Sequence, residues 1–256
     1  NISDKPASYA KFVAAEPFIR VPSLEQQTQL ATLQKQRLEL EQRLKTQAEV
    51  TDVTLAKWQK GLTKAELEKL AEAGLVLRLP LDETLGTTVR SESANVGTIR
   101  GQAKWVTGKQ GGGLEFDGKT YVEIPQAPHF EGNAPFTVGA WAAPATNASM
   151  ALLSRMDEKA NYRGFDVILA AGKVEVHLVS QWPTNALKVT TKKAVIGKEW
   201  QHVLVTYDGS RKAAGLKIYV DGKLEPLEIL NDNLKDSTRT EKPLHLGRRE
   251  DRLPGL

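Results

Sequence analysis

Four side chains suited to catalysis or metal binding lie close together in the stretch EWQHVLVTYDGSRKAAGLKIYVDGKL, residues 199 to 224. Trp200, His202, Tyr207 and Asp208 invite comparison with nucleophilic and metal sites, where histidine and a carboxylate act together. Side chains alternate between the two faces of a strand, which places His202 and Tyr207 on opposite faces. Asp208 and Asp221 each precede a glycine and are better explained as turn residues. We therefore predict that His202 and Asp208 do not point together and that this stretch is structural.

Composition excludes several classes of function. The chain has 256 residues, 40% of them apolar and 26% charged, and a net charge of +4 that is spread along the sequence. A small net charge spread in this way does not indicate a surface that binds nucleic acid. No apolar run approaches the ~20 residues that span a bilayer, and the N-terminal stretch lacks the regions of a signal peptide. Without cysteine the chain has no disulfide framework and no thiolate metal site. We expect a soluble chain that starts inside a longer protein.

The first third of the chain is expected to be helical after an extended lead-in. Residues 1–22 carry three prolines and no periodicity. Ser23 and Gln26 form a capping box, which predicts that a helix begins there. The β-branched run at 50–54 predicts a break in that helix. Before the break, leucines form a narrow heptad stripe: Leu30, Leu33, Leu40 and Leu44.

A second, shorter helix is predicted before the sequence changes character. Thr63 and Glu66 have the spacing of another capping box, and the helix is expected to stop at Gly74. Residues 23–74 would then form a helical hairpin or coiled-coil segment, whose thin apolar stripe needs a partner surface to be stable. A structural spacer is the plainer interpretation, and an oligomerisation element is the alternative.

Residues 75–256 have the sequence pattern of a β-sandwich. Short β-rich runs recur every ~8 to 12 residues, with Gly, Asn and Asp between them. Ala171 and Gly172 predict a tight hairpin turn, and Asp221-Gly222 is a type I′ turn signal. Alternation predicts two sets of residues that each share a face: Phe165, Val167 and Leu169, then Val174, Val176 and Leu178. The fold class predicted is mainly β, an antiparallel sandwich preceded by the helical segment.

Several motifs in fixed order carry a family resemblance. They are GGGLEFDGKTYVEIP, FTVGAWAAP, ALLSRMDEKANYRGFDVILAAGKVEVHL, WQHVLVTYDGS, LKIYVDG and PLHLGRR. In this order they resemble the laminin-G-like, concanavalin A-like lectin/glucanase sandwiches, which implies a jelly roll over about residues 75–256. With the lead-in EPFIRVPSLEQQTQLATLQ, the chain resembles an insert of planctomycete-type, cytochrome-associated multidomain proteins of unknown function. That resemblance implies an exported protein, working in the periplasm or cell envelope.

The sequence departs from this family at its end. Such sandwiches normally continue after the LGRR strand with a segment that closes the sheet beside the first strand, and here the sequence ends at LPGL. We therefore expect a sandwich that lacks its closing strand. Unpaired edges would lie at the runs LVLRLPL and PLHLG, and exposed edges recruit other strands. Such a chain would dimerise or aggregate through that edge.

The resemblance includes glycoside hydrolases, so paired carboxyl groups must be considered. Retaining hydrolysis needs two carboxyl groups ~5 to 5.5 Å apart. Glu115 and Asp117 are the one alternating acidic pair in a β segment, but Asp117 enters an Asp-Gly turn and Glu123 lies a strand away. The chain is therefore predicted not to be an enzyme, with a hydrolase as the less favoured reading.

Binding is the more common use of this fold, and two loops offer polar and aromatic side chains for it. SQWPTNA places Trp182 beside Gln181 and Asn185 in a loop that contains proline, where a ring could stack on a sugar while amides bind hydroxyls. The loop before GFDVIL carries a second group: Arg155, Asp157, Asn161 and Tyr162. The plainer alternative is that Trp182 packs over the edge of the sandwich and that the polar groups are solvated.

The predicted function is therefore a non-catalytic binding or interaction module of a larger exported bacterial protein. Polysaccharide is the candidate ligand, and the alternative is an architectural domain that docks or spaces the flanking domains of its parent. No organic cofactor is expected. Calcium is possible because related sandwiches bind it, but the loop acids are scattered and no spacing singles out a site. Trp105, Trp141 and Trp200 are expected to pack in the core or on a sheet.

Overall fold

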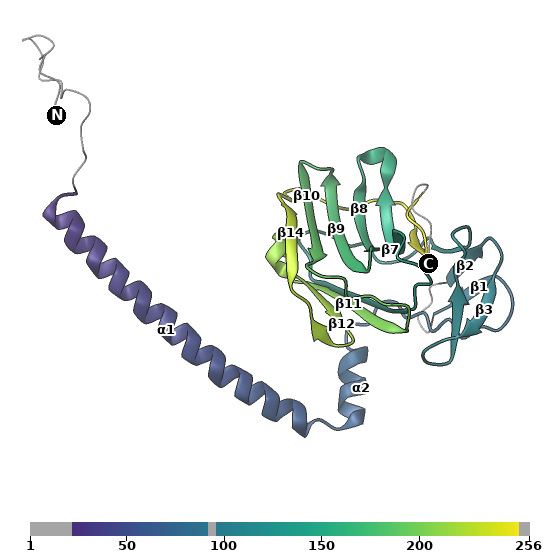
Figure 1. Ribbon diagram of the computed structural model, residues 1–256, viewed down its shortest axis with the longest axis horizontal. Coiled ribbons are helices and arrows are strands. Elements are labelled where there is room, and N and C mark those ends of the chain that lie inside the picture. Colours follow the sequence, from purple (N-terminus) through teal and green to yellow (C-terminus); the bar gives the residue numbers. More distant parts are fainter. Residues whose placement is uncertain (1–21, 92–95, 251–256) are drawn as a thin grey trace, which may run out of the picture. The chain divides into compact units, whose positions relative to one another are not determined.

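The computed structural model describes residues 22–91 and 96–250, which leaves most of the expected lead-in, 1–22, outside the described residues. The chain divides into two compact units, one ending at Ala73 and the other beginning at Gly74. Figure 1 shows the helices of the first unit and the sheets of the second.

The first unit is a long helix followed by a short one. α1 (Leu24–Gly61) begins at the predicted capping box of Ser23 and Gln26. α2 (Lys64–Glu72) begins at the predicted box of Thr63 and Glu66. Both starts were read from sequence because a hydroxyl and a carboxyl or amide group three residues apart satisfy free backbone N–H groups reciprocally.

The predicted break at 50–54 is wrong, because α1 runs through it without interruption. The Thr51 and Thr54 hydroxyls donate to the carbonyl groups of Gln47 and Val50, each at 2.8 Å. β-branched residues lower helix propensity only slightly, which is too little to end a helix here.

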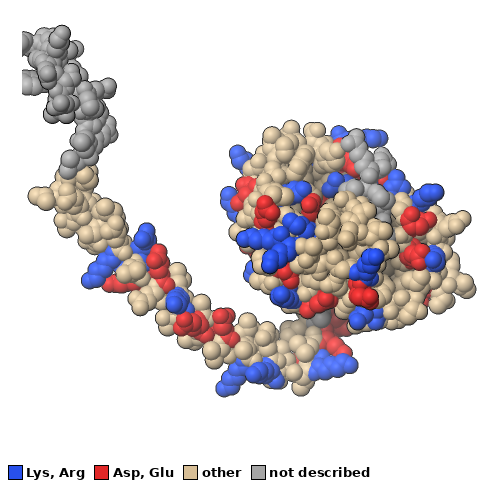
Figure 2. All heavy atoms as spheres, in the orientation of Figure 1, with Lys and Arg blue, Asp and Glu red and all other residues tan. Residues whose placement is uncertain are grey.

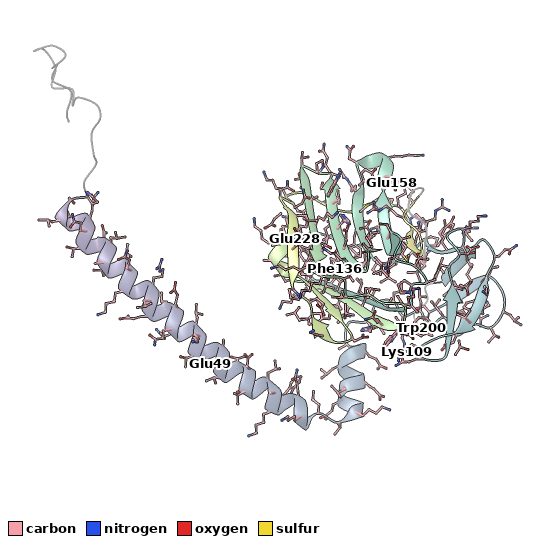
Figure 3. All side chains as sticks on the ribbon, in the orientation of Figure 1. Glu49, Lys109, Phe136, Glu158, Trp200 and Glu228 are labelled. Atoms are coloured by element: carbon pink, nitrogen blue, oxygen red, sulfur yellow. The ribbon has the colours of Figure 1, made fainter. Side chains whose placement is uncertain are left out.

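α1 buries none of its side chains within the described residues, so its apolar stripe is exposed. Figure 3 shows side chains projecting from α1 on all sides, Glu49 among them. Basic and acidic side chains alternate along it (Figure 2), with one ion pair between Arg37 and Glu41. Among residues 22–91 and 96–250, no helix has both the length and the apolar character to cross a membrane.

The second unit is a jelly-roll-like β-sandwich, which confirms the predicted fold class. Its larger sheet has nine strands in the order β1 (Thr88–Arg90), β2 (Val96–Arg100), β5 (Tyr121–Ile124), β15 (Leu244–Leu246), β7 (Met150–Asp157), β8 (Arg163–Ala170), β9 (Lys173–Gln181), β10 (Asn185–Thr191) and β14 (Leu227–Asp232). The smaller sheet has four, in the order β13 (Lys223–Leu224), β12 (Leu216–Val220), β11 (Gln201–Tyr207) and β6 (Phe136–Ala142). β3 (Lys104–Thr107) and β4 (Gly112–Glu115) form a separate pair.

The core lies between the two larger sheets and follows the predicted alternation. Val167 and Val176 of the nine-stranded sheet are fully buried, and Val205 and Ile218 of the four-stranded sheet are buried with them. Phe136, labelled in Figure 3, packs against Phe165 of the opposite sheet, with their ring centres 5.1 Å apart. Each such side chain contributes about 1.5–3 kcal/mol by leaving water, so long-range packing holds this unit together.

Two predicted strand edges differ from the structure. The run LVLRLPL forms no strand, although its alternate leucines, Leu77, Leu79 and Leu81, pack against the core. The strand of PLHLG, β15, lies between β5 and β7 and pairs with both. The expectation that PLHLG is an open edge is therefore wrong. Sequence order does not reveal which strand enters the middle of a sheet.

Candidate functional site

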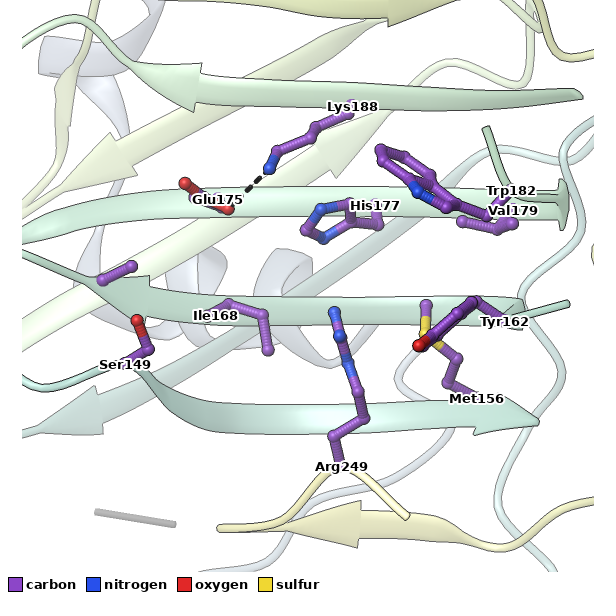
Figure 4. A pocket seen from close by; sticks show the side chains of 11 residues that line it. Ser149, Met156, Tyr162, Ile168, Glu175, His177, Val179, Trp182, Lys188 and Arg249 are labelled. Atoms are coloured by element: carbon purple, nitrogen blue, oxygen red, sulfur yellow. Dashed lines mark ion pairs between the residues drawn. The ribbon is translucent and has the colours of Figure 1, made fainter. Parts of the chain in front are cut away.

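A hollow of about 430 Å³ lies on the face of the nine-stranded sheet that points away from the core. Val167 and Val176 point inward, and their chain neighbours Ile168, Glu175 and His177 line this hollow from the other side of the sheet. Figure 4 shows it over β7 to β10. Its lining consists of Ser149, Met156, Tyr162, Ile168, Ala170, Glu175, His177, Val179, Trp182, Lys188 and Arg249.

Asp166 lies beneath the hollow and fixes two of its polar side chains. It is fully buried and stands opposite His177 in the β8–β9 register. Its Oδ1 is 2.7 Å from His177 Nδ1, and its Oδ2 accepts from Arg249 Nε at 2.6 Å and lies 2.5 Å from Nη2. Burial alone would raise the pKa of Asp166, but the charges of and hydrogen bonds from His177 and Arg249 outweigh it and lower that pKa. The carboxylate is thus ionised and holds both partners in place.

This carboxylate decides which hydrogen bonds the hollow can offer. Because the ionised Asp166 can only accept, His177 Nδ1 carries a proton, and Nε2 is the second hydrogen-bonding nitrogen of the ring. Arg249 donates to Asp166 through Nε and Nη2, and its remaining N–H groups are donors for the hollow. An imidazole nitrogen and a guanidinium donor therefore stand side by side, held by one buried carboxylate.

Aromatic rings stand at one end of the hollow. The Trp182 ring meets His177 edge to face at 5.8 Å, and the Arg249 guanidinium lies 6.0 Å from the centre of the Tyr162 ring. Trp182 and Tyr162 both pack against a small buried cluster of Met156, Val179 and Ala186. An apolar cluster beneath the rings gives them a fixed position beside the polar groups, which is the usual composition of a small-molecule site.

The charges of the hollow balance. Lys188 pairs with Glu175 at 3.0 Å, drawn as a dashed line in Figure 4, and Arg249 pairs with Asp166. These two ion pairs give the site equal numbers of positive and negative groups. Such a site has many directional hydrogen-bonding groups and no net attraction for an ion.

The structure brings the two sequence-predicted loops together. The Trp182 backbone N–H donates to the Asn161 carbonyl at 3.0 Å, which places the rings of Trp182 and Tyr162 at the same hollow. Asn161 and Tyr162 both have positive φ, at 55° and 62°, which makes a tight corner between β7 and β8. Gln181 is exposed at the end of β9, opposite Asn185.

Two other predicted residues hold neighbouring loops and lie away from the hollow. Asn185 donates to Asp236 at 2.6 Å and accepts from the Lys235 backbone at 2.7 Å. Asp157 caps a 3₁₀ turn by accepting from the backbone of Lys159 and Ala160. These side chains hold neighbouring loops, so neither lines the hollow.

Arg155 points to the opposite face of the sheet, into the core. A register shift between Ala151 and Leu153 moves every later side chain of β7 to the other face. Arg155 is 4% exposed and donates to the carbonyl groups of Ala127 and Pro128. Grouping it with the Tyr162 loop was therefore wrong about its direction, because a bulge is not visible in the alternation of residues.

Sequence reasoning missed the polar centre of the hollow, although part of the signal was present. A two-residue turn at Ala171 and Gly172 sets the register of β8 and β9, and that register puts Asp166 opposite His177. The predicted hairpin could therefore have identified this pair. Arg249 gave no such signal, because it reaches Asp166 across 83 positions of sequence.

The other candidates for chemistry are structural. Glu115 pairs with Lys104 at 2.8 Å, Asp117 accepts from backbone N–H groups of its own turn, and neither lines the hollow. His202 packs beside Trp141 at 5.1 Å, while Asp208 accepts from the Ser210 backbone. Within the described part of the chain, no three histidine or acidic side chains come together as metal ligands.

The tryptophans expected to pack in the core or on a sheet lie away from the Trp182 loop. Trp105 is half-buried against the core and donates to the Gly86 carbonyl at 3.3 Å. Trp200 is half-buried, and Trp141 is 37% exposed on the outward face of the four-stranded sheet. Trp141 packs on that face rather than in the core.

Comparisons with known proteins place this fold in a family. No curated protein matches the sequence. Among solved structures, a botulinum neurotoxin serotype G binding domain is 13% identical with a TM-score of 0.42, over 61% of this chain and 43% of that one. The mouse laminin alpha1 chain is 15% identical with a TM-score of 0.38, over 53% of this chain and 33% of that one. This chain thus spans less than half of either structure.

These structural likenesses are weak, and the assignment comes from the sequence instead. The family model Laminin_G_3, described as the concanavalin A-like lectin/glucanases superfamily, matches residues 116–256, more than half of the chain. The matched region contains β5 to β15 and the whole hollow. The chain therefore belongs to the concanavalin A-like lectin/glucanase superfamily, in its laminin G-like branch.

Proposed function

We propose that the sandwich is a non-catalytic module that binds carbohydrate in the hollow over β7 to β10, as part of an exported protein. One observation carries the proposal: the buried Asp166 fixes the His177 ring and the donors of Arg249 next to two aromatic rings. A sugar unit presents hydroxyl groups along its edge and C–H groups on its face. Directional hydrogen bonds beside a ring fit both.

Each part of the hollow has a separate task in this binding. The Trp182 ring takes the apolar face of a sugar unit, since it stands clear of the alternating strands and its position is set by Met156 and Val179. His177 Nε2 hydrogen-bonds to one hydroxyl, and Arg249 donates to its neighbour. The balanced charges favour a neutral ligand, because an anion would meet Glu175 as well as Lys188.

A glycan array with the full chain tests the proposal. We expect saturable binding to a neutral polysaccharide, weakened at least about thirtyfold in Trp182→Ala, as for an aromatic residue that dominates an interface. The matched control is Trp58→Ala, which removes a 53% exposed tryptophan from α1 and should leave binding unchanged. Binding that survives Trp182→Ala, or that both variants weaken equally, would refute the site.

A second function, docking or spacing of other domains, is favoured by a different observation. α1 exposes an apolar stripe along its length, Leu33 at 58% and Leu44 at 71% among it. Exposed leucines of this kind serve packing against another surface. An array without any bound glycan would leave this as the function. Glycan hydrolysis abolished by Glu115→Gln would instead make the protein an enzyme.

A further inference from the structure

The hollow over β7 to β10 extends well beyond its polar centre. Along β9 its lining runs from Glu175 to Val179, four residues of extended strand or about 13 Å at ~3.3 Å per residue. Trp182 carries the lining further, since its ring packs against the cluster that contains Val179. Figure 4 shows Trp182 and Tyr162 at one end, which we call the aromatic end, and Glu175 at the other, with His177 between them. A single pyranose ring is shorter than this hollow.

The end opposite the aromatic rings, which we call the far end, is also apolar at its base and polar at its sides. Ile168 of β8 stands opposite Glu175 in the β8–β9 register, and Ala170 follows two residues later on the same face. Lys188 of β10 pairs with Glu175 at 3.0 Å. Ala170 and Ser149 are the smallest side chains of the lining, which leaves space between them. The far end is therefore a second apolar floor with room above it.

The polar centre lies between these two floors. His177 and Arg249 are held there by the buried Asp166. A glycan has the same alternation, because each ring offers C–H groups on its faces and hydroxyl groups at its edges, beside each linkage. Two consecutive rings, one on each floor, bring the hydroxyl groups beside their linkage to His177 and Arg249. One ring alone would leave one of the two floors uncovered.

We propose that the hollow takes two consecutive units of an extended, neutral glycan chain, one on Trp182 and one over Ile168 and Ala170. This inference rests on the proposed carbohydrate binding and adds the length and shape of the ligand. Both floors lie on the same face of β8 and β9, so both rings have to present a face to the sheet. Chains linked through equatorial bonds form flat ribbons that do this, whereas an axial linkage turns the second ring away. The chain thus runs along the strands.

The polar groups of the far end suit a neutral unit. Lys188 spends a donor on Glu175 and has others left, and the Glu175 carboxylate retains acceptor capacity. The pair thus offers both a donor and an acceptor to the hydroxyl groups of the second unit. A charged unit would be attracted by one member of the pair and repelled by the other. The pair therefore gives no preference for uronic acids or amino sugars.

Calorimetric titration of the full chain with short sugars tests the number of units and their linkage. The probes are glucose, xylose and mannose, each with its equatorially linked disaccharide: cellobiose, xylobiose and β-mannobiose. We expect at least one disaccharide to bind about tenfold or more tighter than its monosaccharide, because the second unit adds its own contacts. Maltose, in which an axial bond joins the glucose units, should bind no tighter than glucose. Equal affinity of every disaccharide and its monosaccharide, or a preference for maltose over cellobiose, would overturn the inference.

Filling the far end locates the second unit. Ser149→Leu/Ala170→Leu places two larger side chains there without touching the core, since Ser149 is exposed and Ala170 half-buried. The advantage of the disaccharide over the monosaccharide should then disappear. The matched control Thr206→Leu adds bulk on the outward face of β11, in the other sheet, and should keep that advantage in full. Circular dichroism checks that both variants fold.

Failure of this inference differs from failure of the proposed function. A folded variant with a filled far end that keeps the disaccharide preference, or that binds neither sugar, would show that no second unit lies there. Failure of all the probes, with another glycan bound on the array and lost in Trp182→Ala, would overturn the inference and leave carbohydrate binding in place. An array without any bound glycan would overturn both.

Discussion

The outward faces of the two sheets have similar sequence patterns and different environments. On the four-stranded sheet, Leu204 and Tyr219 face each other between β11 and β12 and remain half-exposed. On the nine-stranded sheet, a polar row crosses six neighbouring strands, with these residues in register: Lys188, His177, Asp166, Ser154, His245 and Glu123. Asp166 and Ser154 in this row are at most 1% exposed.

Covering side chains account for this difference. Arg249 reaches over β8 to Asp166, and Trp182 closes over His177. Alternation along strands makes an outward face polar, but loops that return over it take the polar groups out of water. Once out of water, the same charges interact more strongly and hold fixed directions. Loops that return over a sheet face can therefore turn its outward polar residues into a hollow with fixed polar groups.

The largest expected effect follows from removing the central charge of this row. Asp166→Asn leaves Arg249 without its buried partner and should lower the free energy of unfolding of the sandwich by about 3–5 kcal/mol. Urea unfolding measures the loss. Lys217→Ala on the exposed face of the other sheet should leave the transition where it is. An Asp166→Asn variant as stable as the unaltered chain would mean that charges on the two outward faces contribute equally to the free energy of unfolding.

Lowering the pH should destabilise the covered outward face of the nine-stranded sheet before the exposed outward face of the four-stranded sheet. Burial lowers the pKa of His245, Arg248 lowers it further, and the attraction of Glu123 does not compensate. His245 therefore takes up a proton at a higher pH in the unfolded chain than in the folded chain. The free energy of unfolding falls as the pH drops through about 6.5, the pKa of unfolded histidine. The free energy of unfolding should differ less between pH 8 and pH 5 in His245→Gln than in the unaltered chain. Equal pH dependence in both proteins would count against a desolvated row.

A smaller effect is expected at the rim of the hollow. Lys188 and Glu175 form an ion pair at 3.0 Å, and their side chains are 21% and 22% exposed. Partial contact with water limits such a pair to about 1 kcal/mol or less. A double-mutant cycle of Lys188→Met and Glu175→Gln should give a coupling energy of that size, weakened by salt. A coupling energy as large as the loss expected for Asp166→Asn would show that the Lys188–Glu175 pair is as shielded from water as Asp166.

Sequence was sufficient for features that depend on neighbouring residues. The helix starts at Ser23 and Thr63 follow from their caps, and the alternation of β8 and β9 follows from a period of two. The laminin G-like resemblance is confirmed by the family match. Trp182 and Tyr162 were singled out because loops carry ring and polar groups together.

What sequence could not supply depends on distant pairing. The bulge in β7 sends Arg155 into the core, β15 inserts between β5 and β7, and Arg249 arrives from the far end of the chain. Each of these is decided by packing between segments, and no local pattern records it. The contact of Arg249 with Asp166 was therefore beyond prediction, whereas the pairing of Asp166 with His177 followed from the predicted hairpin.

The unbroken course of α1 has a consequence for any helix that packs against it. Leu33, Leu44 and Leu55 recur at intervals of 11 residues and are all exposed. Eleven residues complete three turns at about 3.67 residues per turn, slightly more than the 3.6 of a straight helix. A stripe with this period drifts in the direction opposite to that of a heptad stripe. A partner helix following these leucines would wind around α1 with a shallow right-handed twist, in contrast to the left-handed supercoil of a heptad coiled coil.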